Sequence, residues 1–439
     1  MKQTPINFDI VSNKIIESGI QSVGKASIRE IKKLVDNIEN ATGDKYIRME
    51  MGVPGLPPLE VGVQGQIDAL KKGVASIYPD ISGIKPLKHE ISRFVKMFMD
   101  IDVEEEGCIP TVGSMQGGFA AFLILSRIHK NRDTTLFIDP GFPVHKMQHR
   151  LLGLKYDSFD VYNYRGEALK DKLESHFKTG KIHSIIYSNP NNPSWICFKD
   201  EELKIIGELA TKYDVVVMED LAYFGMDFRK DYSNPGVPPY QPSVANYTDN
   251  YILFISSSKK FSYAGERIGM MVISDVLYAS KFENLLNHYP SEKFGYAMVF
   301  GTMYPLSSGT SHSAQYGLLA MLKAVNDGEL DFIEEVKDYG KKAELMKNIF
   351  INNGFEIVYH TDIDEPIAHG FYFTFSYPGM TAEVLLDKLI YYGISAISLL
   401  ITGSEREEGI RACTSLIKYE QMTDLESRLS AFQQNHPIS

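Results

Sequence analysis

The sequence contains few cysteines. Its 439 residues include three, Cys108, Cys197 and Cys413. Because they are odd in number and far apart, they exclude a disulfide-rich secreted scaffold and show no metal-binding spacing. We therefore expect buried or free thiols in a reducing, cytoplasmic compartment, and no metal centre.

Long apolar runs and a positive charge excess are also missing. No run reaches the roughly 18 apolar residues that a membrane helix needs, and the N-terminal sequence lacks the apolar core of a signal peptide. The net charge of −11 argues against a nucleic-acid groove, where a basic stripe is expected. The sequence thus predicts a protein that binds neither membrane nor nucleic acid.

What the chain does contain is enough apolar material for a large core. Apolar residues make up 44% and charged residues 23%, as in globular proteins, and the length exceeds that of one ordinary domain. Strand-like and helical patterns alternate from about residue 80 to 275. This alternation predicts an α/β fold with a mostly parallel sheet and helices on both faces.

A polar segment follows the strand-like run 251–255. Three serines, at 256–258, precede Lys259 and Lys260, and Arg267 follows. Hydroxyls and a guanidinium suit a phosphate monoester, and a lysine can form an imine with an aldehyde. An aldehyde and a phosphate on one small molecule indicate pyridoxal 5'-phosphate. A polar turn with a solvated lysine pair is the alternative interpretation of this segment.

Two further segments suit the same cofactor. The glycine-rich turn at Gly113-Ser114-Met115 precedes an apolar helical run, and the free N–H groups at a helix start form a natural phosphate cradle. Asp220 ends a β-branched strand, where α/β folds place their chemistry. An aspartate there can hold a pyridine nitrogen protonated, which makes the ring an electron sink.

The pattern Ser-x-Ser-Lys-x-Phe-x-x-x-Gly-x-Arg-Ile-Gly, which starts at Ser256, resembles the lysine signature of class I/II aminotransferases. These are pyridoxal-phosphate enzymes of fold type I, similar to aspartate aminotransferase. The register identifies Lys259 as the lysine that binds the cofactor and Lys260 as its bystander. Separate matches follow the family's order along most of the chain: Gly52, the Gly113 loop, Asn192, Asp220 with Tyr223, Lys259 with Arg267, and Arg411.

The resemblance implies a role for each matching residue. Phe142 would stack on the pyridine ring, Asn192 and Tyr223 would bond the ring oxygen, and Tyr78 would reach the phosphate of the neighbouring subunit. Trp195 departs from the pattern, because the family has a glycine there. The implied catalytic residues are Lys259, Asp220 and Tyr223; the implied substrate-binding residues are Gly52, Asn192 and Arg411; the implied cofactor-binding residues are Tyr78, Gly113, Ser114, Met115, Phe142, Asn192, Asp220, Tyr223, Ser256, Ser258, Lys259 and Arg267.

The family fold implies two domains. We expect a large cofactor-binding domain at residues 59–324, and a smaller α+β domain built from both chain ends, residues 1–58 and 325–439. The resemblance also implies a homodimer with shared active sites. The Pro-rich segment 229–250 is long for the family and either borders the site or decorates the surface.

The implied reaction is transamination between an L-amino acid and a 2-keto acid. Members that act on acidic substrates often use an extra arginine, and this chain has none from Ile268 to Ser404. A neutral or aromatic amino acid is therefore favoured. Two alternatives stay open: a pyridoxal-phosphate lyase, such as a C–S lyase or decarboxylase, and a non-catalytic regulator that binds the cofactor.

Overall fold

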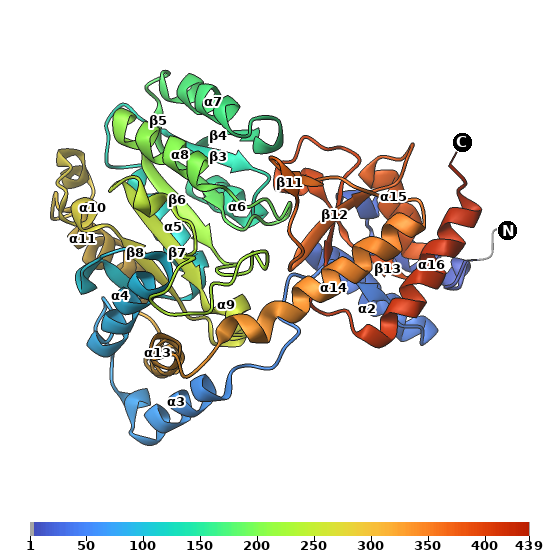
Figure 1. Cartoon of the computed structure of the whole chain (residues 1–439), viewed down its shortest axis with the longest axis horizontal. Coiled ribbons are helices and arrows are strands. Elements are labelled where there is room, and N and C mark those ends of the chain that lie inside the picture. Colours follow the sequence, from blue (N-terminus) through green and yellow to red (C-terminus); the bar gives the residue numbers. More distant parts are fainter. Residues whose placement is uncertain (1–3, 439) are drawn as a thin grey trace. The chain divides into compact units, whose positions relative to one another are not determined.

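The computed structural model describes residues 4–438 and divides the chain into two compact units. The N/C unit comprises the chain up to Gly55, the short segment Asn192–Ile196 and the chain from Lys337 onward. The central unit comprises Leu56–Asn191 and Cys197–Val336. Each unit has its own sheet, and Figure 1 colours both along the sequence.

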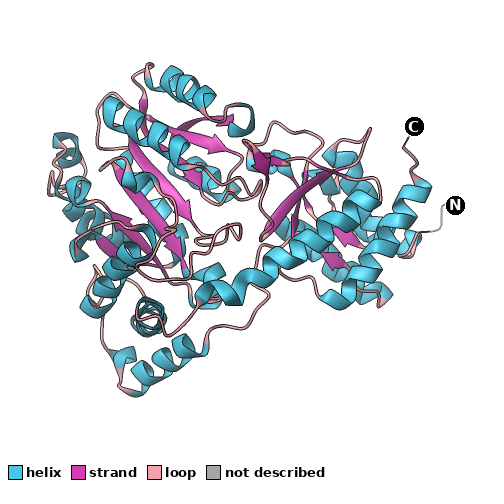
Figure 2. Ribbon diagram, viewed as in Figure 1, coloured by secondary structure: helices cyan, strands magenta, loops and turns pink. Residues whose placement is uncertain are grey.

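The central unit is built on a seven-stranded sheet with strand order β2-β8-β7-β6-β5-β3-β4. Strands β3 to β7 run parallel, and β8 runs antiparallel to both of its neighbours. Figure 2 shows this sheet with helices around it. The strands are β2 (Cys108–Thr111), β3 (Thr134–Asp139), β4 (Lys155–Asp160), β5 (Ile182–Ser188), β6 (Val216–Leu221), β7 (Tyr251–Ser256) and β8 (Gly269–Ile273).

Both faces of this sheet are buried. Phe137, Met218 and Phe254 pack with helix α5 in one core cluster, and the alternate residues Val217 and Leu253 on the opposite face are buried as well. This explains the near-continuous apolar runs in the strands, which are typical of a parallel sheet covered on both sides. The longer helices of this unit are α3 (Glu60–Lys71), α4 (Lys85–Met99), α5 (Gly113–Leu125), α6 (Pro143–Leu152), α7 (Glu167–Phe177), α8 (Asp200–Tyr213) and α13 (His312–Asn326).

The N/C unit contains a four-stranded antiparallel sheet with order β14-β15-β12-β9. A separate parallel pair joins β1 to β13. The helical pattern expected after Ser27 forms α2, with the Ser27–Glu30 capping box in place. The elements are α1 (Phe8–Ser18), α2 (Ile28–Thr42), β1 (Ile47–Arg48), β9 (Glu356–Ile357), β12 (Tyr372–Ser376), α15 (Ala382–Leu389), β13 (Ile394–Ser395), β14 (Ile397–Ser398), β15 (Ile410–Cys413) and α16 (Met422–Asn435).

The strand β1 is only two residues long, Ile47–Arg48. The helical sequence after His312 is divided into α13 and α14 (Phe332–Asn352). Among the described helices, none is long and apolar enough to cross a membrane.

The Pro-rich segment 229–250 packs against its own unit. The backbone N–H groups of Gly236 and Gln241 donate to the carbonyls of Met97 and Phe98 at the end of α4. Ser243 donates its hydroxyl to the buried carboxylate of Glu219 at 2.5 Å. These contacts anchor the segment to α4 and β6.

Candidate active site

In the central unit, the candidate residues gather at the carboxyl ends of the parallel strands. Side chains alternate between the faces of a strand, so Asp220 lies on the same face as Met218, and Ser256 on the same face as Phe254. That is the face covered by α5. The fold therefore brings Asp220, Ser256 and the start of α5 to one edge and one face of the sheet.

The glycine turn and the arginine after the lysine are in contact. Gly113 begins α5 with φ +63°, and a Cβ there would lie 2.7 Å from Nη2 of Arg267. Gly269 approaches Ser114 so closely that its Cβ would lie 3.1 Å from the Ser114 amide nitrogen. Free helix N–H groups and a guanidinium thus converge, an arrangement suited to a phosphate.

The serine segment forms the one-turn helix α9 (Ser257–Lys260). Ser256 caps it, because its hydroxyl accepts the backbone N–H of Ser258 at 3.1 Å. Ser257 donates its hydroxyl to the Ile268 carbonyl, which ties α9 to the strand that follows. Lys259 and Ser258 are half-buried.

Lys260 has a different environment from Lys259. Its side chain is 1% exposed, and its Nζ has no hydrogen-bond partner among the described residues. Burial holds the pKa of this amine well below its usual value. Nζ lies 4.0 to 5.8 Å from the centroids of four surrounding rings, those of Phe94, Phe224, Phe261 and Phe332.

Asp220 is buried at the end of β6. Its carboxylate accepts the backbone N–H of Ala222 at 3.2 Å, but burial dominates and raises its pKa to about 7. Nε2 of His145 lies 4.0 Å from Oδ2 of Asp220. Burial lowers the pKa of His145 to about 3, so the neighbour of Asp220 is a neutral imidazole.

Sequence reasoning missed His145. It lies in α6, three residues after Phe142, which is the residue that precedes the helix. Their rings meet edge to face with centroids 5.4 Å apart. The spacing from Phe142 was the one available signal.

A chain of neutral polar groups continues behind His145. The Nδ1 of His149 bonds the His145 carbonyl at 3.1 Å, and its Nε2 lies 2.9 Å from the Thr135 hydroxyl. Ser184 bonds both Thr135 and the Nδ1 of His183. Burial lowers the pKa of His149 to about 4 and that of His183 to about 3, so these histidines carry no charge near neutral pH.

Three further predicted residues lie in the central unit. The backbone carbonyl of Met115 accepts a hydrogen bond from the side-chain amide of Gln148. Tyr223 is buried in the turn after β6. Tyr78 is 88% exposed on the surface.

In the N/C unit, Arg411 lies in β15 and is 2% exposed. Its Nη2 donates to the Glu50 carbonyl at 2.7 Å and its Nη1 to Oδ1 of Asn192 at 3.3 Å. Its Nε has no hydrogen-bond partner within residues 4–438, and no described carboxylate forms an ion pair with it. The nearby acidic residues of the sequence, Glu407 and Glu408, therefore do not pair with Arg411.

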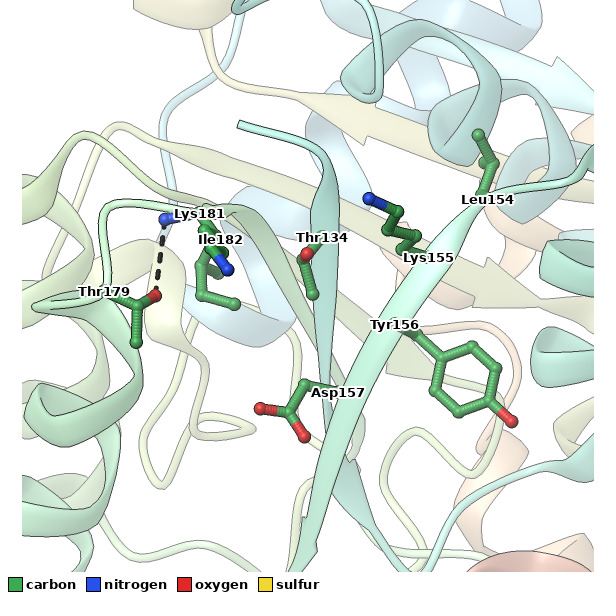
Figure 3. A pocket seen from close by; sticks show the side chains of 8 residues that line it. All are labelled: Thr134, Leu154, Lys155, Tyr156, Asp157, Thr179, Lys181 and Ile182. Atoms are coloured by element: carbon green, nitrogen blue, oxygen red, sulfur yellow. Dashed lines mark hydrogen bonds between the residues drawn. The ribbon is translucent and has the colours of Figure 1, made fainter. Parts of the chain in front are cut away.

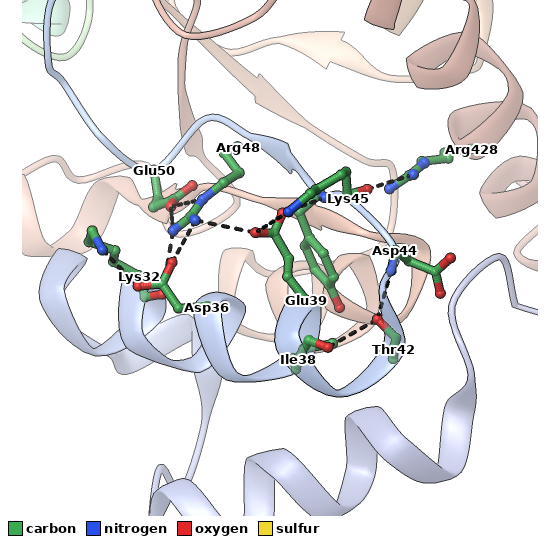
Figure 4. A network of polar contacts seen from close by, with 11 residues as sticks. Lys32, Asp36, Ile38, Glu39, Thr42, Asp44, Lys45, Arg48, Glu50 and Arg428 are labelled. Atoms are coloured by element: carbon green, nitrogen blue, oxygen red, sulfur yellow. Dashed lines mark hydrogen bonds and ion pairs between the residues drawn. The ribbon is translucent and has the colours of Figure 1, made fainter.

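The carbonyl that Arg411 uses is held by a charged network. Figure 4 shows Glu50 beside Arg48, whose guanidinium bonds the carboxylates of Glu50 and Asp36. The second oxygen of Glu50 accepts the Ser395 hydroxyl at 2.7 Å. With both carboxylate oxygens engaged, the Glu50 backbone is fixed where its carbonyl meets Arg411.

Gly52 also contacts this cluster. A Cβ at Gly52 would lie 2.0 Å from the hydroxyl oxygen of Tyr372. The Tyr372 ring lies 4.4 Å from the Arg411 guanidinium carbon. The structure therefore brings the three predicted substrate-binding residues, Gly52, Asn192 and Arg411, into one cluster of the N/C unit.

A hollow of about 490 Å³ lies elsewhere in the central unit. Figure 3 shows its lining, which includes Thr134, Lys155 and Ile182 at the amino-terminal ends of β3, β4 and β5. The candidate residues lie at the carboxyl ends of the parallel strands, so this hollow is not part of the candidate site.

Comparison with known proteins identifies a family. A profile described as "Aminotransferase class I and II" matches residues 44–422. A probable aspartate aminotransferase of Methanocaldococcus jannaschii is 26% identical over 348 residues, which is 79% of this chain and 81% of the relative. An aromatic-amino-acid aminotransferase of Thermococcus litoralis is 28% identical over 55% of this chain and 60% of its own length.

The fold also has solved counterparts. The structure of an aspartate aminotransferase from Thermotoga maritima superimposes with a TM-score of 0.74 at 18% identity, covering 96% of this chain and 99% of that one. This likeness supports the fold alone, which is that of the aspartate aminotransferases.

Proposed function

Because the chain belongs to the class I and II aminotransferase family, we propose that it transfers an amino group between an L-amino acid and a 2-keto acid. Pyridoxal 5'-phosphate is the proposed cofactor, carried by a domain of residues 59–324. The observation that supports this most is the contact between Gly113, at the N-terminus of α5, and Arg267, which follows the segment that bears Lys259.

The residues present fit this cofactor. Gly113, Ser114 and Arg267 would hold the phosphate, with Ser256 and Ser258 beside it. Asp220 would face the ring nitrogen: its carboxylate is buried beside a neutral histidine with its pKa raised to about 7, and a pyridinium would supply the missing positive partner. Phe142, Asn192, Tyr223 and Met115 complete the proposed binding set.

When bound, the cofactor supplies an electron-withdrawing ring that stabilises negative charge at the substrate's α-carbon. Lys259 would hold the cofactor and, once displaced by the substrate amine, would take the α-proton as base and deliver it as acid to the cofactor carbon. Asp220 would keep a proton on the ring nitrogen, and Tyr223 would donate a hydrogen bond to the ring oxygen.

Arg411 is the proposed partner of the substrate's α-carboxylate, with Asn192 and Gly52 beside it. Five N–H donors belong to a guanidinium, and the two bonds to Glu50 and Asn192 use two of them. Arg411→Leu should lower kcat/KM by about a hundredfold with a near-normal melting temperature. Arg411→Lys should recover little, because lysine lacks the planar fork. An unchanged substrate titration in Arg411→Leu would refute this role.

For the substrate, we propose a neutral or aromatic side chain, since no arginine occurs between Ile268 and Ser404 to pair with a distal carboxylate. Relatives named for aspartate and for aromatic amino acids both match this chain. A panel of L-phenylalanine, L-leucine and L-aspartate, each with several 2-keto acids, tests the preference. L-Aspartate as the best donor would contradict it.

The same panel separates the proposed reaction from its rivals. Exchange of the amino group between amino acid and keto acid supports a transferase. Release of ammonia, thiol or carbon dioxide supports the lyase alternative, and no spectral change of the loaded protein supports a regulator.

We also propose a homodimer in which Tyr78 reaches the cofactor phosphate of the partner subunit. Its 88% exposure leaves the side chain available for such a contact. Ile77, its neighbour in the sequence, is exposed as well, at 58%.

A further inference from the structure

The only tryptophan of the chain occupies a backbone conformation that favours glycine. Trp195 has φ +65°, in the left-handed region, and its side chain is fully buried. This conformation is strained for any residue with a Cβ, because the Cβ comes too close to the following carbonyl oxygen. Such strain persists only where the surrounding packing holds the residue in place.

Gly370 provides the space for the indole. A Cβ on Gly370 would lie 2.0 Å from Cε2 and 2.1 Å from Cζ2 of Trp195. The indole therefore lies directly on the backbone of Gly370, whose carbonyl accepts the Thr414 hydroxyl at 3.2 Å. Any larger residue at 370 would push the indole away.

From this position Trp195 contacts the ring beneath the arginine. The centroids of Trp195 and Tyr372 lie 6.2 Å apart at an interplanar angle of 69°, an edge-to-face pair. The guanidinium carbon of Arg411 lies 4.4 Å from the centroid of Tyr372. Trp195, Tyr372 and Arg411 thus form a continuous stack within the N/C unit.

The Tyr372 ring adds a restraint on the guanidinium to that of its hydrogen bonds. The Glu50 carbonyl and Asn192 hold the Nη2 and Nη1 atoms by hydrogen bonds, and the guanidinium carbon lies over the Tyr372 ring. A cation over an aromatic ring is attracted to it more strongly when both are desolvated. Movement of the Tyr372 ring would therefore tilt the donors that face a carboxylate.

We propose that Trp195 is a positioning residue for Arg411: by fixing the Tyr372 ring, it sets how strongly the site selects a carboxylate over a neutral group of the same shape. This inference rests on the proposed role of Arg411 in carboxylate binding. Trp195 itself would act through Tyr372 and would not contact the substrate.

The test compares two ligands of nearly the same shape, a carboxylate and its neutral amide. Binding of 3-phenylpropanoate and of 3-phenylpropanamide to the cofactor-loaded protein is measured by calorimetry, and the ratio of their dissociation constants gives the carboxylate preference. Trp195→Leu should reduce this preference about tenfold, Trp195→Phe less because a ring remains, and Arg411→Leu should abolish it.

A control variant separates positioning from stability. Phe432 is a fully buried ring of α16 in the same unit, and its core cluster includes Ile410 and Ala412, whose side chains lie on the face of β15 opposite to that of Arg411. Phe432→Leu should lower the melting temperature and leave the carboxylate preference unchanged. If Trp195→Leu fails to fold, Gly370→Ala displaces the indole from the opposite side and should reduce the preference in the same way.

The outcomes distinguish this inference from the function on which it rests. If Arg411→Leu has the same carboxylate preference as the wild type, the proposed role of Arg411 fails. If Arg411→Leu loses the preference while the Trp195 and Gly370 variants keep it, the positioning role of Trp195 is overturned.

Discussion

Lys259 and Lys260 are neighbours in sequence with opposite surroundings. Lys260 lies among four phenylalanine rings with no hydrogen-bond partner for its Nζ in the described chain, so it cannot turn to replace its neighbour without leaving that cage. Lys259→Ala should therefore abolish covalent cofactor attachment. Borohydride reduction followed by peptide mapping should place the label on Lys259, and a label on Lys260 would contradict the assignment.

The buried amine of Lys260 also carries a stability cost. Because its pKa lies well below the usual value, unfolding takes up a proton, and stability rises with pH from the folded pKa up to about pH 10. Lys260→Met should remove that slope and raise the free energy of unfolding at neutral pH by about 1–3 kcal/mol. Denaturant titrations at several pH values measure both, with the exposed Lys85→Met as control. An unchanged slope would show that Lys260 keeps its proton when buried.

Asp220 makes stability depend on pH in the opposite direction to Lys260. Its folded pKa, about 7, exceeds that of an unfolded aspartate, so the cofactor-free protein loses stability as pH rises from about 4 to about 7. Asp220→Asn should have a higher melting temperature than the wild type at about pH 8 and the same melting temperature at about pH 4. It should also lose most of the catalytic activity. The exposed Asp171→Asn serves as control. A variant with near-normal turnover would mean that Asp220 is structural.

At the scale of the element, the start of α5 depends on a glycine for two reasons. Gly113 has a positive φ, and a Cβ there would meet the Arg267 guanidinium. Gly113→Ala should weaken pyridoxal 5'-phosphate binding about tenfold or more, and binding of pyridoxal, which lacks the phosphate, much less.

Gly153→Ala is the matched control for this prediction. Gly153 also has a positive φ, of +67°, but no atom lies within 4 Å of the Cβ position, so alanine brings backbone strain without a clash. Equal effects of the two substitutions on both ligands would show that Gly113 does not shape a phosphate site.

The elements themselves were largely predictable, and the contacts around the site were not. The strand at 251–255 was predicted from its apolar run and the strand before Asp220 from its β-branched run, and both runs reflect burial on both faces of the sheet. The rings around Lys260 come from residues 94, 224, 261 and 332, and no local pattern relates positions so far apart. The packing of Trp195 could not be predicted for the same reason, since the space that its indole fills is provided by Gly370.

At the scale of the whole molecule, the proposed dimer gives a further expectation. The native mass should be twice 49.5 kDa. Tyr78→Phe should weaken cofactor binding by a few-fold, because a phosphate loses one hydroxyl donor, and Tyr304→Phe, another exposed tyrosine, should not. Sedimentation and cofactor titration measure these quantities. A monomer that binds the cofactor with full affinity would contradict the shared site.

The single tryptophan makes the protein its own optical reporter. Light absorbed only by indole excites position 195, which is fully buried in the N/C unit, so the emission should be blue-shifted in the native state and move to the red when that unit opens. Circular dichroism instead follows the helices of both units. A difference between the two melting curves would measure how independently the two units unfold, with no label and no change to the sequence.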